Sequence, residues 1–267
     1  MKRLMAALVV LVALAACGEA PDREHTRAVA DVPVLVRPMV YREPDPETRR
    51  GLGPDGRPDL CVRAKCVALT FDDGPMEHTE RLLEILARYD ALATFFVVGK
   101  MVEEFPDVVR KEVAAGHEIA NHSWDHSDLA SLSAEGVTAQ IQRTQDAILR
   151  QSGYRSVLLR PPYGSSNERV AKVAASFGLP EIIWAVDPMD WRDRSSSLVT
   201  RRVLSETRPG GVVLMHDIHA TTVDAVPAIL EGLAAKGYRF VTVSRLFQGT
   251  VLKPGHQYRE RKTSVAR

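Results

Sequence analysis

The stretch CVALTFDDGP, residues 66–75, places two aspartates directly after an apolar run. A short apolar run that ends in turn residues is typical of a strand buried on both faces. Gly74 permits a sharp backbone turn and Pro75 fixes it. We therefore predict a buried strand that carries Asp72 and Asp73 to its carboxyl end, although an ordinary turn or helix cap would explain an isolated Asp-Asp-Gly equally well.

Runs rich in β-forming residues alternate with stretches of helical period after residue 59. The predicted strands cover 66–72, 93–98, 117–121, 156–160, 181–186, 211–216 and 239–243, and the predicted helices cover 79–89, 106–115, 133–151, 167–177, 198–206 and 222–236. Alternation of this kind indicates parallel βαβ units in an open sheet or a closed barrel, and periodicity does not choose between the two. No G-x-G-x-x-G opens a first helix, so a Rossmann dinucleotide site is not predicted.

The N-terminus has the composition of an export signal. Lys2 and Arg3 precede the apolar residues 4–16, a length typical of a signal peptide and short for a membrane span. The sequence LAAC, residues 14–17, resembles a bacterial lipobox. We expect 1–16 to be removed and Cys17 to carry a lipid that tethers the protein outside the cytoplasmic membrane. A plain secretory signal is the alternative.

The rest of the chain divides by composition. Residues 17–58 are rich in Pro, Arg, Asp and Glu and are predicted to form a tether or loose extension. We assign residues 59–250 to one domain and 251–267 to a C-terminal tail. With Cys17 lipidated, Cys61 and Cys66 form an even pair and predict a disulfide in an oxidising compartment.

The net charge gives no sign of a nucleic-acid partner. The sequence contains 35 Lys and Arg against 34 Asp and Glu, for a formal charge of +1. No bulk field exists to steer the protein onto a polyanion, and no basic patch is evident in the sequence.

Ionisable side chains follow five of the predicted strands. They are Asp72-Asp73, Asn121-His122, Arg160, Asp187 with Asp190-Trp191, and His216-Asp217. The carboxyl ends of parallel strands share one rim, where such folds carry their active sites. A single member could be a solvated loop charge or a helix cap, but five together favour an active site.

The stretch HSWDH, residues 122–126, spaces two histidines at i and i+4. This spacing is similar to half of the H-E-x-x-H motif, but Ser123 replaces the glutamate, so a base must come from elsewhere. One carboxylate would complete a His-His-Asp site with an open position. A hydrolytic metal site needs an anionic ligand and a separate base, and two adjacent aspartates could divide these tasks. Two solvent-facing loop histidines are the alternative.

Five stretches together resemble a known family. They are TFDDGP (70–75), HSWDH (122–126), RPPYG (160–164), DPMDW (187–191) and LMH (214–216). Their order and spacing are similar to the motifs of the NodB-homology polysaccharide deacetylases, carbohydrate esterase family four, over roughly residues 62–248. The resemblance implies an α/β fold, a distorted (β/α) barrel of about seven parallel strands, and metal-dependent hydrolysis of N-acetyl or O-acetyl groups on a polysaccharide.

The resemblance also implies roles for the metal half of the site. Asp73, His122 and His126 would hold a divalent metal, zinc in the first instance and cobalt as the alternative. Asp72 would be the general base, and Arg160 would keep it ionised and oriented.

The remaining motifs supply the other roles that the resemblance implies. The backbone N–H of Tyr163 would help to form the oxyanion hole. His216 would be the general acid, supported by Asp190, whose pairing raises the pKa of the imidazole. Trp191 and Leu214 would shape the pocket for the acetyl methyl group.

Several polar residues are left without a defined role. Asp187 could support the site or fix its loop. His78 is either a surface residue or a substrate contact. We interpret His117, His219 and His256 as structural or exposed.

The sequence therefore predicts a monomeric, membrane-tethered deacetylase acting on an extracytoplasmic glycan. N-acetylglucosamine or N-acetylmuramic acid of peptidoglycan fits the tether best, with chitin-type oligomers and acetylxylan as alternatives. A noncatalytic glycan-binding lipoprotein is disfavoured because no motif position is broken. A glycosidase is disfavoured because its two carboxylates must flank one bond, and the adjacent Asp72 and Asp73 are poorly placed for that.

Overall fold

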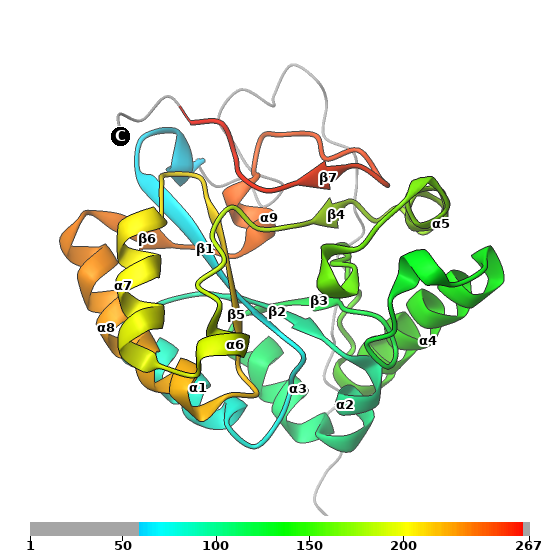
Figure 1. Cartoon of the computed structure of the whole chain (residues 1–267), viewed down its shortest axis with the longest axis horizontal. Helices are drawn as coiled ribbons and strands as arrows, with labels where there is room; N and C mark the ends of the chain where they lie inside the picture. Colours follow the sequence, from blue (N-terminus) through cyan, green and yellow to red (C-terminus); the bar gives the residue numbers. More distant parts are fainter. Residues whose placement is uncertain (1–58, 264–267) are drawn as a thin grey trace, which may run out of the picture. The chain divides into compact units, whose positions relative to one another are not determined.

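The computed structural model of the chain describes residues 59–263, so the predicted signal peptide, Cys17 and the tether lie outside the described residues. The strands are β1 (Lys65–Asp72), β2 (Thr94–Val97), β3 (Glu118–Asn121), β4 (Glu181–Ile182), β5 (Val212–His216), β6 (Tyr238–Phe240) and β7 (Gln257–Tyr258). Strand β1 is central and pairs in parallel with β2, β5 and β6, and β2 pairs in parallel with β3 (Figure 1).

Single-residue bridges close these strands into a ring. Asn121 at the end of β3 pairs with Leu159, Leu159 pairs with Glu181 of β4, and Val186 pairs with Val213 of β5, all in parallel. The ring confirms the predicted distorted α/β barrel, which periodicity alone left open.

The distortion has a local cause at the predicted strand 156–160, where only Leu159 pairs, through one bridge to Asn121 and one to Glu181. Pro161 and Pro162 follow directly and have no N–H to donate to a ladder. The predicted strand 181–186 is likewise reduced to β4 and the bridge at Val186.

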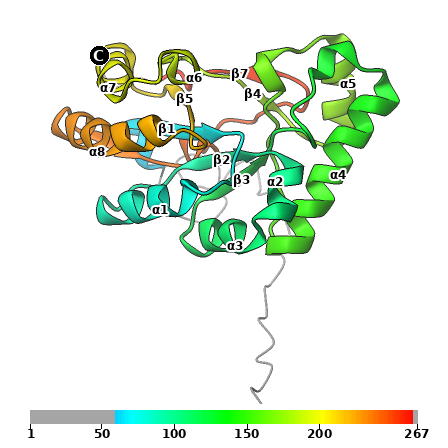
Figure 2. The same ribbon diagram turned by 60° about the horizontal axis from the view of Figure 1, so that its bottom comes forward.

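The six predicted helices are present, each within two residues of its expected ends. They are α1 (Thr79–Arg88), α3 (Pro106–Ala114), α4 (Ala134–Ser152), α5 (Glu168–Ser176), α7 (Ser196–Glu206) and α8 (Ala220–Ala235). Capping fixes α4 at both ends, because the Ser133 hydroxyl accepts from the Gly136 N–H and Gly153 adopts the left-handed conformation. Figure 2 shows these helices outside the strands.

Short elements were not anticipated from periodicity, because each is too brief to show a pattern. They are the helices α2 (Gly99–Glu104), α6 (Asp190–Asp193) and α9 (Val243–Leu246), and the 3-10 turns η1 (Leu60–Val62), η2 (Leu129–Ser131) and η3 (Pro162–Gly164). Among residues 59–263, no helix is both long enough and apolar enough to cross a membrane.

The alternation of side chains along β1 decides what enters the barrel. Val67, Leu69 and Phe71 belong to the core packed under the helices, whereas Ala68 belongs to a second cluster on the opposite face. Side chains alternate with period two, so Asp72 lies on the same face as Ala68. The polar end of the strand is therefore directed into the ring rather than into the helical layer.

The C-terminal segment adds pairing that the sequence did not predict. Strand β7 lies parallel to β4, and Glu260 forms an antiparallel bridge with Gly211 (Figure 1). Gly210 makes room for this segment, because a Cβ there would lie 2.1 Å from the Arg261 carbonyl oxygen. The described part of 251–267 thus packs against the barrel.

The predicted disulfide is confirmed. Cys61 in η1 is bonded to Cys66 in β1, and both are buried. The bond ties the beginning of the described chain to the central strand.

Candidate metal centre and active site

Asp73, His122 and His126 meet at the carboxyl ends of β1 and β3. The Nε2 atoms of His122 and His126 lie 3.5 and 3.2 Å from Asp73 Oδ1, and each residue offers one ligand atom within 4.8 Å of the others. Asp73 (φ 76°) and His126 (φ 61°) both have left-handed backbones. Such strain in non-glycine residues is concentrated at functional sites.

The hydrogen bonds of His122 prepare it to bind a metal. Its Nδ1 lies 2.7 Å from the Arg160 carbonyl oxygen, which can only accept, so Nδ1 carries the proton. Nε2 is the ring nitrogen that faces Asp73 and His126, and it is the atom that could ligate a metal. A histidine ligand whose second nitrogen donates to a carbonyl is the usual arrangement around protein-bound metals.

The donor set fits a divalent metal ion. Asp73 Oδ1 is buried, yet no hydrogen bond reaches it from the described residues. Burial alone would raise the pKa of Asp73, but its interactions with His122 and then His126 lower it well below its usual range. An ionised carboxylate with an uncompensated buried oxygen beside two imidazoles matches the three-ligand sites that zinc occupies in hydrolases.

Asp72 is held separately from this cluster by Arg160. One guanidinium nitrogen donates to Asp72 Oδ1 at 2.6 Å and to Thr70 Oγ1 at 2.8 Å, and Nε donates to the Ile182 carbonyl at 2.9 Å. Asp72 and Arg160 are both buried. The second oxygen of Asp72 lies 3.6 Å from His122 Nε2, so it faces the metal ligands.

His216 and Asp190 form a second pair at the end of β5. Asp190 Oδ1 lies 2.9 Å from His216 Nδ1, and Oδ2 accepts from the His216 N–H and the Thr222 hydroxyl, each at 2.8 Å. Burial by itself lowers the pKa of His216, but the hydrogen bond and charge of Asp190 outweigh burial and raise it to about 9. This imidazole is therefore a cation at neutral pH.

Three further residues predicted for the site adjoin these groups, because Tyr163 contacts His126, Trp191 follows Asp190 in the chain and Leu214 precedes His216 in β5. Tyr163 has φ 61° and is exposed, with its ring edge-on to His126 at 4.6 Å between centroids. Trp191, in α6, leaves 46% of its surface exposed next to Asp190, whereas Leu214 of β5 is buried. Aromatic surface left exposed at a site mouth is suited to packing against a sugar ring.

The structure places the polar residues whose roles were open. Asp187 accepts a hydrogen bond from the Met189 N–H at 2.8 Å, and Met189 has a left-handed backbone, so Asp187 fixes its loop. His78 stands directly before α1, and its Nε2 lies 3.3 Å from Oε1 of Glu77. His117 is buried, accepts from the Ala93 N–H at 3.2 Å, and has its pKa lowered by burial to about 4.

The other two histidines do not belong to the Asp73, His122 and His126 group, although the His219 ring centroid lies 6.1 Å from that of His216. His219 is partly buried and contacts the Arg194 guanidinium, and His256 is exposed.

Two supporting residues were missed from the sequence, and a third, Asp217, was noted there only as an ionisable residue after the strand 211–216. Thr222 holds Asp190, and Gln140 of α4 binds the backbone of the HSWDH loop. Asp217 is buried and accepts from the Thr79 hydroxyl; a Cβ on Gly74 would lie 2.5 Å from its carboxylate. No local pattern marks them, because each contact joins segments distant in the sequence.

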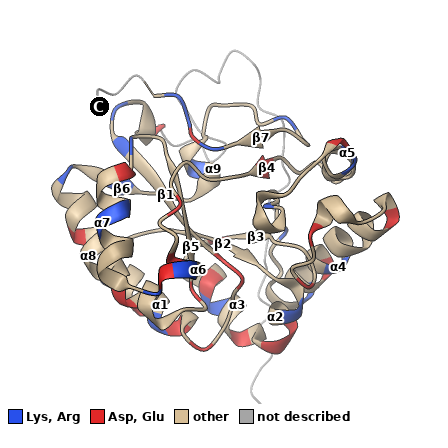
Figure 3. Cartoon of the chain, in the orientation of Figure 1, with Lys and Arg blue, Asp and Glu red and all other residues tan. Residues whose placement is uncertain are grey.

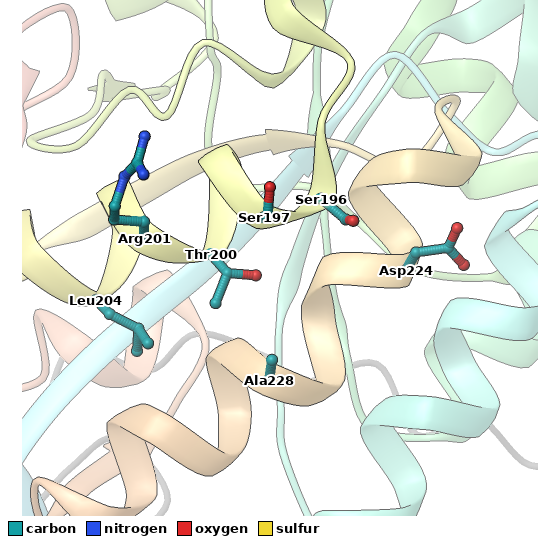
Figure 4. A pocket seen from close by; sticks show the side chains of 7 residues that line it. All are labelled: Ser196, Ser197, Thr200, Arg201, Leu204, Asp224 and Ala228. Atoms are coloured by element: carbon teal, nitrogen blue, oxygen red, sulfur yellow. The ribbon is translucent and has the colours of Figure 1, made fainter.

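The outer surface offers no competing centre of this kind. Figure 3 shows Lys and Arg interspersed with Asp and Glu along the outer helices. A hollow of about 580 Å³ lies between α7 and α8 (Figure 4), lined by Ser196, Ser197, Thr200, Arg201, Leu204, Asp224 and Ala228. Within residues 59–263, the only cluster of three ligand-type side chains is the Asp-His-His group.

Comparison with known proteins agrees with this geometry. The family profile described as polysaccharide deacetylase matches residues 59–182. The peptidoglycan-N-acetylglucosamine deacetylase PgdA of Listeria monocytogenes is 43% identical over 201 residues, 75% of this chain and 42% of the relative. The peptidoglycan-N-acetylmuramic acid deacetylase PdaC of Bacillus subtilis is 41% identical over 183 residues, 68% of this chain and 38% of the relative.

A solved structure extends the likeness to the whole domain. The T48 deacetylase, determined with substrate, is 42% identical with a TM-score of 0.72, and the match covers 74% of this chain and 98% of that one. In contrast, this chain spans only about two-fifths of the length of the curated relatives PgdA and PdaC.

Proposed function

The chain belongs to the polysaccharide deacetylase family, and from this premise we propose that it is a metal-dependent enzyme that hydrolyses acetyl groups from an N-acetylated glycan and releases acetate. One observation carries the proposal: the Asp-His-His cluster, the Asp72–Arg160 pair and the His216–Asp190 pair meet on one rim of the barrel. Hydrolysis of O-acetyl esters would use the same groups.

The chemistry of an amide explains why three groups are needed. An amide carbonyl is a weak electrophile and an amine is a poor leaving group. A site that hydrolyses it must activate water, stabilise negative charge on the acyl oxygen and protonate the nitrogen.

Asp73, His122 and His126 are the residues that would hold the metal ion. When bound, a divalent ion supplies Lewis acidity, which acidifies water and polarises the acetyl carbonyl. The free oxygen of Asp72, facing these ligands, accepts the proton of the attacking water. Arg160 keeps Asp72 oriented and compensates its buried negative charge.

Oxyanion stabilisation and protonation of the leaving nitrogen are assigned to other residues of the site. The Tyr163 backbone N–H is assigned to the oxygen of the tetrahedral intermediate. His216, cationic beside Asp190, donates its Nε2 proton to the amide nitrogen. The C–N bond then breaks, acetate forms and a free amine remains on the sugar. Trp191 and Leu214 are assigned to the acetyl pocket.

Peptidoglycan is the substrate we propose. Its support is the names of the relatives PgdA and PdaC, which act on N-acetylglucosamine and N-acetylmuramic acid of peptidoglycan. A lipid on Cys17, after removal of residues 1–16, would hold the enzyme outside the cytoplasmic membrane within reach of the wall. Zinc is the proposed metal, and the enzyme is proposed to act as a monomer.

Acetate release from purified glycans tests the proposal. The full chain should release acetate from peptidoglycan, lose this activity in a chelator and regain it with zinc or cobalt. Chitin oligomers and acetylxylan form the comparison panel. Release of reducing ends instead of acetate, or a rate that does not respond to chelation and reloading, would overturn it.

A further inference from the structure

The loop that carries both histidine ligands has a strained backbone. Ser123 (φ 69°) and His126 (φ 61°) are left-handed although neither is glycine. Non-glycine residues hold this conformation only where the surroundings impose it. The Ser123 N–H donates to Asn121 Oδ1 at 2.9 Å and the His126 N–H to Ser123 Oγ at 3.0 Å, and two neighbouring helices add further contacts.

The first turn of α2 binds the carbonyl groups of the loop. The Gly99 N–H donates to the Ser123 carbonyl and the Lys100 N–H to the Trp124 carbonyl, each at 3.0 Å. Gly99 is required for this approach, because a Cβ there would lie 2.5 Å from the Trp124 ring. These contacts fix the carbonyl side of the loop only.

Gln140 of α4 binds the N–H side. Its Oε1 accepts from the Trp124 N–H at 2.8 Å and from the Asp125 N–H at 3.3 Å, and its Nε2 donates to Asp125 Oδ1 at 2.8 Å. The same Asp125 oxygen accepts from the hydroxyl of Ser127 at 2.6 Å. One amide therefore contacts two of the three residues between the histidines, Trp124 and Asp125.

We propose that Gln140 is a positioning residue that sets the metal affinity of this site by holding the HSWDH loop in its ligating conformation. It touches neither substrate nor metal and acts through residues 124 and 125. The inference rests on the metal site of the proposed function and is independent of which glycan the enzyme uses. Loss of an outer partner of a metal ligand commonly weakens metal binding 10- to 100-fold.

The test is zinc affinity of the full chain, measured by competition with a chromophoric chelator and no glycan present. Gln140→Met keeps the side-chain length and removes all three hydrogen bonds, so the dissociation constant should rise about 10- to 100-fold. Gln140→Glu keeps an acceptor for both N–H groups but replaces the Nε2 donor by an oxygen that faces Asp125 Oδ1, so it should also lose zinc affinity. If Gln140→Met does not fold, Gln140→Ala carries the same comparison.

Gln142→Met is the matched control, because Gln142 is exposed on the same helix and its side chain donates a hydrogen bond to Asp146 at 2.7 Å. It should bind zinc within about twofold of the wild type. Excess zinc should restore acetate release to Gln140→Met, which a general loss of fold would prevent. Unchanged zinc affinity in Gln140→Met, or an equal loss in Gln142→Met, would overturn the inference. Weakened zinc binding without acetate release from any glycan would overturn the proposed function alone.

Discussion

Two histidines on opposite sides of the site differ in the group that Nδ1 contacts. In His122 the partner is the Arg160 carbonyl oxygen at 2.7 Å, and in His216 it is the buried carboxylate of Asp190 at 2.9 Å. A neutral acceptor orients the ring and leaves Nε2 free to ligate, whereas a buried anion stabilises the imidazolium. The group that Nδ1 contacts is therefore what distinguishes the proposed metal ligand, His122, from the proposed acid, His216.

The adjacent aspartates, Asp73 and Asp72, also differ in the partners of their carboxylates. Asp73 has a buried oxygen that no described residue satisfies, and Asp72 is neutralised by Arg160 at 2.6 Å. One carboxylate is left for an added cation and the other already has one. Asp73 and Asp72 can be tested separately, because they contact different partners.

Removing a proposed metal ligand should have the largest effect on acetate release. Asp73→Ala takes away the only anionic member of the cluster, so zinc binding and acetate release should both fall to background. Zinc content after dialysis and acetate release measure the two losses. Asp146→Ala, an exposed carboxylate on α4, is the control and should retain both. Zinc retained at full occupancy by Asp73→Ala would refute its place among the ligands.

Asp72→Asn should separate metal binding from turnover. Asparagine keeps the shape but cannot accept the proton from water, so acetate release should fall about 10²- to 10⁴-fold while zinc affinity stays within about threefold. Metal titration and acetate release on one preparation give both values. A near-normal rate would remove the assignment of Asp72 as base.

Asp190→Asn tests the proposed general acid, His216, through the pH dependence of the rate. Without the carboxylate the pKa of His216 should fall from about 9 towards its ordinary 6.5, so the alkaline limb of the rate profile should move to lower pH. Activity at pH 8 should fall about 10- to 100-fold and less at pH 6. Thr222→Val, which removes one hydrogen bond to Asp190, should give a smaller shift in the same direction. An unmoved alkaline limb would contradict the assignment.

The His216–Asp190 pair should also make the free energy of unfolding depend on pH, in a direction that the raised pKa of His216 fixes. The raised pKa means that folded His216 binds its proton more tightly than the unfolded chain does. This stabilisation is fully present below pH 6.5 and is lost as the pH rises to about 9. Asp190→Asn should therefore lower the free energy of unfolding by on the order of 2 kcal/mol at pH 6 and by less above pH 9. Chemical denaturation at both pH values measures the difference.

The smallest effect on acetate release is expected at Asp217, whose carboxylate packs against Gly74. Burial raises its pKa to about 7, so the stability present below its ordinary 3.8 is lost as the pH rises to about 7. Asp217→Asn keeps an acceptor for the Thr79 hydroxyl and removes this loss, so the free energy of unfolding above pH 7 should be higher than in the wild type. Urea denaturation at pH 5 and 8 checks it. A variant with the same pH dependence as the wild type would show that Asp217 is not the group responsible.

The features that could be predicted from the sequence are those with a pattern in neighbouring residues. The helices, the buried strand β1 and the ionisable residues after each strand follow from periodicity and from the common rim of parallel strands. The spacing of HSWDH and the pair Asp72-Asp73 indicated a metal site, the family resemblance assigned Asp73, His122 and His126 to it, and the structure brings these three residues together.

The remainder depends on contacts that only the folded chain makes. Strand β7 pairs across 76 residues of sequence with β4, and Gln140 reaches the ligand loop from another helix. Thr222 contacts Asp190 from 32 residues away. Their residue types are ordinary for surfaces and helices, so nothing in the sequence distinguishes them until the backbone is placed.

Anomalous diffraction at the zinc edge from zinc-loaded crystals tests the central claim most directly. The account predicts one zinc peak within bonding distance of Asp73, His122 and His126, with Asp72 still paired to Arg160 and outside the coordination shell. A peak at another site, or Asp72 released from Arg160 and bound to the zinc, would contradict the division between ligand and base.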